Sequence, residues 1–388
     1  MLNPTAARRR FMRRRLIRRR SIRCRILIAR YIGQGLVAFV AFVVAALLLN
    51  QIIPSPKVPS NVVFIGPKYD YYQAHKDDYD VLFFGSSRVY NHIVPDIFDA
   101  SARTAGVAVN SYNFGIPAMR ALDTTVLIDD VLSDPPENLK WVFVETILDK
   151  GYEPIPNART HRSMYWHTWE NTGLAARYIL TSDQSWPSKT ALLVSHLLPA
   201  LYRQMNVGRL FSQVLPSEFS EREKEVAEEF TANEGYFPLT REDSPDRQAF
   251  LNDLQGYEAL VDDLSETVAQ PIASEVELAR NKRMLLLKME RVIRAAGAEP
   301  IFIEPPSLEP SRDFQIALQN GNIDTLLAYK DPARFPQLYQ PDQRYDADHL
   351  TKLAAREFSQ LLAEDFVQTL EVQVSEAQKI EDQKTNDQ

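Results

Sequence analysis

The stretch DVLFFGSS, which runs from Asp80 to Ser87, decides the fold. An apolar run that stops at a glycine and two serines is typical of a buried strand that meets a turn, and it predicts a strand over residues 80–84. Similar apolar runs predict further strands over 107–114, 140–144 and 300–303. Apolar residues at helical spacing predict helices over 119–132, 274–296 and about 350–367. Strands that alternate with helices indicate an α/β fold, a parallel sheet with helices on both faces.

The N-terminal end of the chain differs sharply in charge from the remainder. Residues 1–30 hold twelve arginines and no lysine or acidic residue, whereas the other 358 residues hold 32 basic and 51 acidic groups. Residues 31–53 follow, contain no charged residue and are almost wholly apolar in the middle. About 20 apolar residues cross a bilayer as a helix. We therefore expect a single transmembrane helix over 31–53.

The arginines also predict the orientation of this helix. Basic segments beside a membrane helix stay in the cytoplasm. We therefore expect the chain to lie in the inner (cytoplasmic) membrane, with its globular part in the periplasm or outside the cell. Arginine clusters also occur in nucleic-acid binders, but beside an apolar helix they favour contact with membrane lipid, and no nucleic acid is expected. Residues 7–13 resemble a twin-arginine export signal, yet no small-residue cleavage motif follows Ile53, which favours an uncleaved anchor.

The remaining composition predicts how the chain is divided. Residues 151–270 break the strand–helix rhythm, because they are first aromatic and then strongly charged, and we interpret them as a mostly helical insertion. Residues beyond about 372 are polar and charged, and we expect them to be disordered. The expected parts are a cytoplasmic segment 1–30, a membrane helix 31–53, a linker and domain entry 54–79, an α/β domain 80–370 and a polar tail 371–388.

The residue types that can carry chemistry gather at predicted strand ends. In an open parallel sheet, ligands bind beyond the carboxyl ends of the strands. Ser87 follows the first strand directly after Gly85 and Ser86, and its hydroxyl can project into the crevice. Asn113 and Gly115 end the next strand, where a glycine can bring a bare backbone N–H close to a reacting atom.

Asp346 and His349 stand just before the last predicted helix. A carboxylate three residues before a histidine can hold the imidazole, and the ring can then take a proton from a serine and return it later. The order Ser87, Asp346, His349 is one of several chain orders compatible with a catalytic triad. With one cysteine and six scattered histidines, neither a metal site nor a cofactor is expected.

Taken together, these blocks resemble the SGNH/GDSL hydrolase superfamily over residues 80–148 and 283–366. The closest resemblance is to membrane-tethered members of envelope polysaccharide systems, such as alginate O-acetylation proteins and the D-alanyl transfer protein of teichoic-acid operons. The resemblance implies a flavodoxin-like sheet with Ser87 as nucleophile, His349 as base and Asp346 as its partner. It further implies that the backbone N–H groups of Gly115 and Ser87 stabilise the oxyanion.

One block departs from the pattern of that superfamily. Its third block usually supplies an asparagine as a further oxyanion donor, but here the third strand ends in Val-Glu-Thr-Ile. Thr146 or an insertion residue is the expected substitute; slow turnover, or binding without catalysis, is the alternative. Candidate substrate contacts are Arg88, Asn113 and Trp166. For Arg88 an ion pair with a carboxylate such as Glu145 is equally open, and for Trp166 a place in the core of the insertion is the alternative to a glycan platform.

The resemblance implies acyl-ester chemistry on a cell-envelope or exported polysaccharide, by a serine esterase or an O-acyltransferase. A membrane tether favours transfer, with a multispanning membrane acyltransferase as a partner that supplies acyl groups. The rival expectation is a non-catalytic protein that holds or assembles glycan in the same crevice.

Overall fold

The computed structural model describes residues 29–49, 52, 58–59, 62–148, 160–205 and 220–386, and the chain divides into two compact units. In the first unit, the helix Ala29–Leu49 has a mean hydropathy of 2.5 and is long and apolar enough to cross a membrane, as the sequence predicted. The arginine-rich residues 1–28, residues 50–51 and 53 of the predicted membrane helix, and residues 54–57 and 60–61 of the linker lie outside the described residues.

The second unit is built on a five-stranded sheet in which every neighbouring pair of strands is parallel. The strand order β2-β1-β3-β4-β5 is that of flavodoxin-like sheets. Four strands fall on the predicted apolar runs; β5 was not predicted, because it is three residues long and only half buried. The strands are β1 (Val81–Gly85), β2 (Ser111–Gly115), β3 (Trp141–Val144), β4 (Glu299–Glu304) and β5 (Leu326–Ala328).

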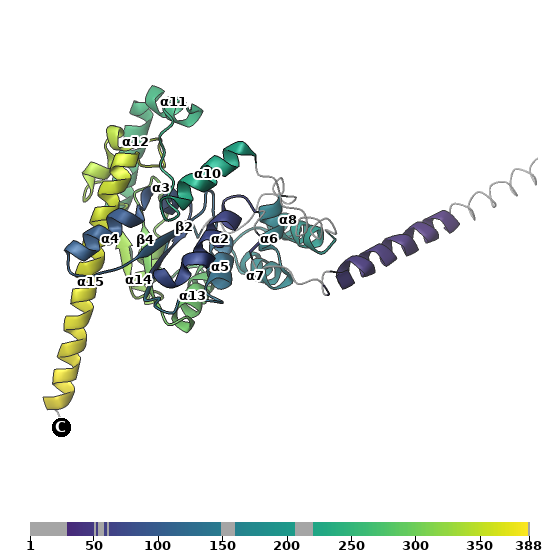
Figure 1. Ribbon diagram of the computed structural model, residues 1–388, viewed down its shortest axis with the longest axis horizontal. Helices are drawn as coiled ribbons and strands as arrows, with labels where there is room; N and C mark the ends of the chain where they lie inside the picture. Colours follow the sequence, from purple (N-terminus) through teal and green to yellow (C-terminus); the bar gives the residue numbers. More distant parts are fainter. Residues whose placement is uncertain are drawn as a thin grey trace, which may run out of the picture. The chain divides into compact units, whose positions relative to one another are not determined.

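Strand β1 shows why both faces of the sheet are covered. Successive side chains of a strand point to opposite faces. Leu82 and Phe84 therefore enter one hydrophobic core, and Val81 and Phe83 enter the other, with all four side chains fully buried. The first core lies against α5 (Ala121–Val131) and α13 (Arg280–Ala295), and the second lies against α4 (Pro95–Thr104) and α15 (Lys352–Asn386), as Figure 1 shows.

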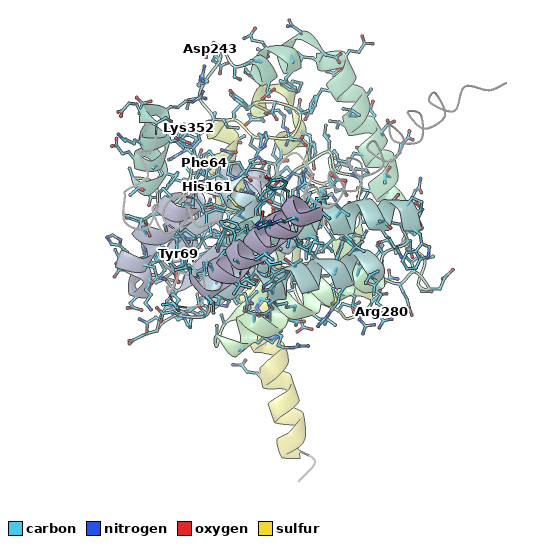
Figure 2. All side chains as sticks on the ribbon, turned by 90° about the vertical axis from the view of Figure 1, so that its right-hand side faces the viewer. Phe64, Tyr69, His161, Asp243, Arg280 and Lys352 are labelled. Atoms are coloured by element: carbon cyan, nitrogen blue, oxygen red, sulfur yellow. The ribbon has the colours of Figure 1, made fainter. Side chains whose placement is uncertain are left out.

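Three helices were predicted at these places, and two of them have different bounds. Helix α13 begins at Arg280 rather than at residue 274. Helix α15 continues to Asn386, so the expectation of disorder beyond residue 372 is wrong. That segment is rich in Glu, Gln and Lys, which are strong helix formers even without a packed face. The C-terminal turns of α15 extend beyond the rest of the domain (Figure 2).

The described part of the insertion at 151–270 is mostly helical, and a further helix lies within the domain entry at 54–79. The remaining helices are α2 (Ile65–His75), α3 (Ser87–His92), α6 (His161–Trp166), α7 (Trp169–Leu180), α8 (Trp186–Met205), α10 (Glu221–Thr231), α11 (Pro245–Asn252), α12 (Leu254–Ala269) and α14 (Asp313–Gln319).

The loop after α10 ties the insertion to the end of the sheet. Asn113 N–H donates to the carbonyl of Glu234 at 2.9 Å, and Phe237 N–H donates to the carbonyl of Tyr90 at 3.0 Å. Gly235 has φ 89°, and a Cβ there would lie 2.1 Å from the Asn113 carbonyl oxygen. Only glycine allows both that backbone conformation and that close approach. The insertion is thus held beside the carboxyl ends of β1 and β2.

Candidate active site

The turn after β1 places Ser87 at the first position of α3. A Cβ on Gly85 would lie 2.3 Å from Val89 Cγ2 and 2.7 Å from Glu145 Oε2, so the turn requires glycine. Ser86 is buried; its hydroxyl caps the helix, and its N–H donates to Glu145 Oε2 at 2.6 Å. Both polar groups of Ser86 therefore make structural hydrogen bonds, whereas Ser87 is partly exposed.

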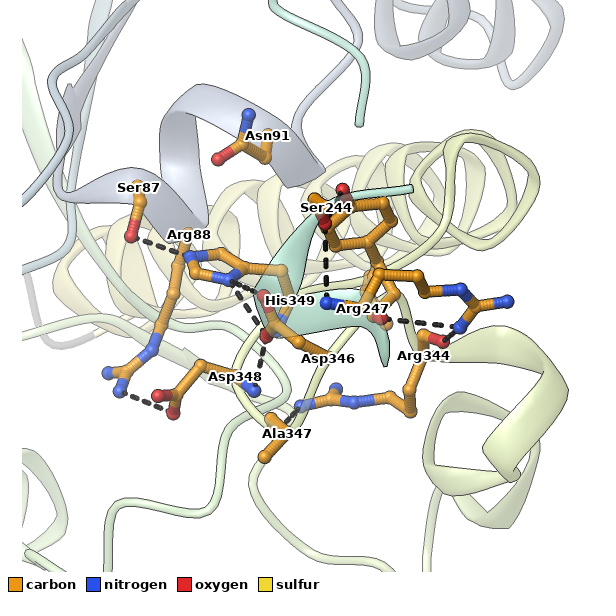
Figure 3. A network of polar contacts seen from close by, with 12 residues as sticks. Ser87, Arg88, Asn91, Ser244, Arg247, Arg344, Asp346, Ala347, Asp348 and His349 are labelled. Atoms are coloured by element: carbon orange, nitrogen blue, oxygen red, sulfur yellow. Dashed lines mark hydrogen bonds and ion pairs between the residues drawn. The ribbon is translucent and has the colours of Figure 1, made fainter. Parts of the chain in front are cut away.

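Ser87, His349 and Asp346 meet as the sequence predicted (Figure 3). His349 Nε2 lies 2.8 Å from Ser87 Oγ. On the other side of the ring, His349 Nδ1 lies 2.9 Å from both carboxylate oxygens of Asp346. Hydrogen-bond reach from the serine to the base, and from the base to the residue that orients it, is the geometry that activates a serine.

Asp346 is held as an anion. Its Oδ1 also accepts the N–H groups of Asp348 and His349, each at 2.8 Å. Partial burial alone would raise the pKa of Asp346, but the contact with His349 and the two backbone N–H groups outweigh it and lower the pKa below its usual value. A charged carboxylate fixes the proton of the imidazole on Nδ1 and leaves Nε2 free to accept the serine proton.

The loop that carries Asp346 and His349 is braced by side chains that sequence reasoning missed. Arg344 is fully buried and donates to the carbonyls of Ala347, at 2.7 Å, and Pro306, at 3.4 Å. Arg247 of α11 donates to the carbonyl of Arg344 at 2.8 Å, and Ser244 Oγ bonds to the Tyr345 hydroxyl. No signal in the sequence joins residue 247 to residue 344, because the contact forms only when the insertion folds back on the domain.

Gly115 does not serve as predicted. Its N–H donates to Asn113 Oδ1 at 2.7 Å, so it is not free to stabilise an oxyanion. A Cβ there would lie 2.2 Å from the Tyr90 nitrogen, and the glycine therefore permits close packing of β2 against α3. Ala118 is placed differently: it is exposed, has φ 55° and lines the same cavity as Ser87 and His349. A positive φ is uncommon for a residue other than glycine.

Asn113 and Trp166 are not substrate contacts in this structure, contrary to expectation. Asn113 is fully buried, and its amide donates to the carbonyls of Val89 and Ile93, each at 2.8 Å. Trp166 is 2% exposed and belongs to a hydrophobic core. Asn113 therefore locks the end of β2 to α3. Trp166 is a core residue rather than a glycan platform, and it lies in the same core as Leu82 and Phe84 of β1.

Arg88 and Thr146 lie away from the cavity that Ser87 lines. Arg88 takes the ion-pair alternative: it is buried, with Nη1 3.8 Å from Glu145 Oε1 and Nη2 3.7 Å from Asp348 Oδ1. This is a structural bridge between the end of β3 and the His349 loop. Thr146 is buried, with its hydroxyl 3.5 Å from that of Thr124. Both residues line a separate small hollow at the ends of β3 and β4.

Three other histidines of the described chain, His92, His167 and His196, are buried in structural roles, whereas His75 and His161 are exposed. His92 Nε2 accepts the N–H of Leu350 at 3.1 Å, and burial lowers its pKa well below the usual value, which fits a helix residue rather than a second base. In the insertion, His167 Nε2 lies 2.8 Å from His196 Nδ1, and burial lowers their pKa values to about 4 and about 3. No group of three or more potential metal ligands occurs among the described residues.

Ser87 and His349 open onto a cavity of about 950 Å³. Its walls come from α2, α3, the turn after β2, α10 and the segment from Phe237 to Asp246. That volume is within the range of sites that bury a small organic molecule, roughly 300–1,000 Å³. An activated serine at the edge of such a cavity can attack a carbonyl group and carry its acyl part.

Comparison with known proteins adds no assignment: no family model matches the chain, and no curated protein matches it. The interpretation of the site rests on its geometry and on the short sequence blocks that form it.

Proposed function

We propose that this protein is a membrane-anchored serine esterase or O-acyltransferase that uses Ser87, His349 and Asp346. The observation that carries the proposal is the continuous chain of contacts from Ser87 Oγ through the imidazole to Asp346, at 2.8 Å and 2.9 Å. A buried structural histidine would not need a hydroxyl on one nitrogen and a carboxylate on the other at the edge of a large cavity.

In the proposed reaction, Ser87 Oγ attacks the carbonyl carbon of an ester while its proton passes to His349 Nε2. The tetrahedral intermediate collapses when the C–O bond to the alcohol breaks, and His349 returns the proton to the departing oxygen. Water or a sugar hydroxyl then gives its proton to His349 and attacks the acyl-serine. The acyl group leaves as a carboxylic acid or as a new ester, and Ser87 regains its proton.

The negative oxygen of each intermediate needs hydrogen-bond donors near Ser87. Among the described residues, none accepts the N–H of Ser87 or that of Ala118. Ser87 begins a helix, where the first N–H groups have no partner within the helix. Because Ala118 lines the same cavity with a positive φ, its N–H replaces that of Gly115 in the proposal.

The place of action follows from the N-terminal part of the chain. The apolar helix Ala29–Leu49 anchors the domain, and the arginines before it keep that end in the cytoplasm. The resemblance to envelope acylation proteins suggests a cell-envelope polysaccharide as the substrate and a multispanning membrane acyltransferase as the supplier of acyl groups.

A second candidate function is glycan binding or assembly without catalysis. The residues after β3 favour this candidate. Glu145 there accepts the N–H of Ser86 and lies near Arg88, and its carboxylate cannot donate a hydrogen bond to an oxyanion. Loss of one such donor costs about 10²–10³ in rate. Slow turnover is therefore expected under the first proposal, and none under the second.

Hydrolysis of a small activated acetyl ester by the full chain in lipid nanodiscs distinguishes the two functions. Slow hydrolysis that Ser87→Ala abolishes supports the catalytic proposal. Ser86→Ala is the matched control, because it removes a hydroxyl one residue away and should retain activity. Activity that is equal in all three proteins, or absent from the wild type, would favour the glycan-binding candidate.

A further inference from the structure

The cavity beside Ser87 has a mostly apolar wall, which bears on the group that the serine carries. Its partly exposed apolar side chains come from four separate elements of the domain. They include Phe64, Pro67, Pro117, Val226, Phe237 and Leu239. An acetyl group would use only the part nearest Ser87 and leave the remaining apolar surface in contact with water. Burial of that surface by a ligand would be favourable.

The aromatic rings at the base of the cavity are not open platforms for sugar rings. Tyr90 stacks on Phe237 with ring centroids 5.4 Å apart and planes at 6°, and Lys68 Nζ lies 4.5 Å from the Tyr90 centroid. Tyr90 and Phe230 are 3% and 1% exposed. Tyr90 and Phe230 therefore present almost no face for a sugar to stack on, and Phe237 has one face covered by Tyr90. An aliphatic chain needs no such face, because its packing is not directional.

The charges at the rim add a second constraint. Four carboxylates and two guanidinium groups line the cavity apart from the catalytic groups, so its surroundings are acidic. They are Glu223, Glu225, Glu229, Asp246, Arg222 and Arg241. A negatively charged acyl group would be repelled by this excess and would also leave water to enter an apolar space. The rim therefore selects against negatively charged acyl groups, and the apolar wall disfavours a charge of either sign, because burial of an unpaired charge is costly.

We infer that the cavity binds the acyl part of the substrate, and that this part is an uncharged aliphatic chain longer than acetyl. The inference rests on the proposed function, because the chain must be joined to the carbonyl that Ser87 attacks. The chain would extend from Ser87 along Pro117 and Phe237 toward Val226 and Leu239. The bond that forms and breaks remains the ester bond, so no additional reactant is required.

A chain-length series tests this inference with the full protein in nanodiscs. The substrates are p-nitrophenyl acetate, butyrate, hexanoate and octanoate. Each buried methylene should raise kcat/KM about three- to fourfold, since its transfer from water is worth ~0.8 kcal/mol. The octanoate should therefore exceed the acetate by at least a hundredfold. An ester of succinate, which ends in a carboxylate, should react more slowly than the butyrate.

Two matched variants locate the effect. Leu239→Trp fills the cavity and should lower kcat/KM for the octanoate much more than for the acetate, so that most of the preference for octanoate is lost. Leu260→Trp makes the same change at an exposed site on α12 and should behave as wild type. Because both variants share the nanodisc, the partitioning of long esters into lipid cannot explain a difference between them.

The outcomes separate this inference from the function on which it rests. If acetate is hydrolysed in a Ser87-dependent manner but kcat/KM is flat along the series, the inference is overturned and the esterase proposal stands. A preference for octanoate that Leu239→Trp does not change would also overturn it. If no ester is hydrolysed and a fluorophosphonate does not label Ser87, the proposed function fails and the inference falls with it.

Discussion

The two halves of the candidate site are held in place by different means. Ser87 sits at the end of β1, where the strand register, Gly85 and a helix cap determine its position. His349 sits on a loop that side chains hold: Arg344 from within the loop and Arg247 from the insertion. Backbone pairing in a buried sheet is made by many hydrogen bonds, whereas a braced loop depends on a few side-chain contacts. We therefore expect that removal of one supporting side chain lowers activity little when it lies beside Ser87, and much more when it lies beside the His349 loop.

The largest effect is expected from removal of the base. His349→Ala should lower kcat/KM for an acetyl ester by about 10³–10⁴, because a serine hydroxyl without a base is a weak nucleophile at neutral pH. The temperature of unfolding should change little, since His349 is partly exposed. Steady-state kinetics and circular dichroism of the same preparation measure both. A variant that unfolds much earlier than wild type would show that His349 is structural.

Asp346→Asn should be about ten- to a hundredfold less severe than His349→Ala, because it disturbs the orientation and tautomer of the ring but keeps the base. Asp346→Ala removes both oxygens that lie 2.9 Å from His349 Nδ1, so it should lower kcat/KM at least as much as Asp346→Asn. Steady-state kinetics of both variants measure the loss. Full activity in both variants would contradict the assigned role of Asp346.

Arg247→Met tests whether the His349 loop depends on a few side-chain contacts. This change removes the donor to the carbonyls of Arg344 and Tyr345, at 2.8 Å and 3.2 Å, while it leaves Ser87 untouched. We expect kcat to fall about tenfold or more from misplacement of His349. If Arg247→Met retains full activity, the loop is held by other contacts and the difference between the halves is smaller than stated.

Ser86→Ala is the counterpart on the serine half. Loss of the helix cap should destabilise the domain by about 1 kcal/mol. Activity should remain within a few-fold of wild type, because Gly85 and the sheet still direct Ser87. Thermal unfolding and ester hydrolysis are measured on the same preparations. Ser86→Ala should lose stability but keep its activity, whereas Arg247→Met should lose activity. A hundredfold loss of activity in Ser86→Ala would remove that contrast.

The smallest effect on activity is expected at Asp99, which supports β2 away from the site. Its Oδ2 accepts the N–H of Ser111 at 3.0 Å; burial raises its pKa to about 7, against the opposing hydrogen bond. The folded pKa exceeds that of the unfolded chain, about 3.9. The folded state therefore binds more protons between these values, and stability should fall as the pH rises from about 4 to 7.

Asp99→Asn should remove this dependence, because an amide does not titrate and can still accept the hydrogen bond. The variant should gain stability over wild type on the order of a few kcal/mol at pH 8, and little at pH 4. Unfolding midpoints measured across that range check the sign. A variant whose advantage grows toward low pH would show that Asp99 is stabilised as an anion.

The serine half was the more predictable one from sequence. An apolar run, a glycine and a serine are adjacent in the chain, so β1 and Ser87 could be placed together, and Asp346 with His349 form a local pair. What sequence did not reveal depends on side chains far apart in the chain. Asn113 Oδ1 accepts the N–H of Gly115, and Arg247 of the insertion donates to the carbonyl of Arg344. Strand β5 has only three residues, too few to form a recognisable apolar run.

Covalent labelling tests the central claim, that Ser87 is an activated nucleophile, most directly. The full chain in nanodiscs is treated with a serine-directed fluorophosphonate, digested and mapped by mass spectrometry. The account predicts one modified peptide with the label on Ser87, lost in Ser87→Ala, strongly reduced in His349→Ala and kept in Ser86→Ala. A label on another serine, or equal labelling of Ser87 in wild type and His349→Ala, would contradict it.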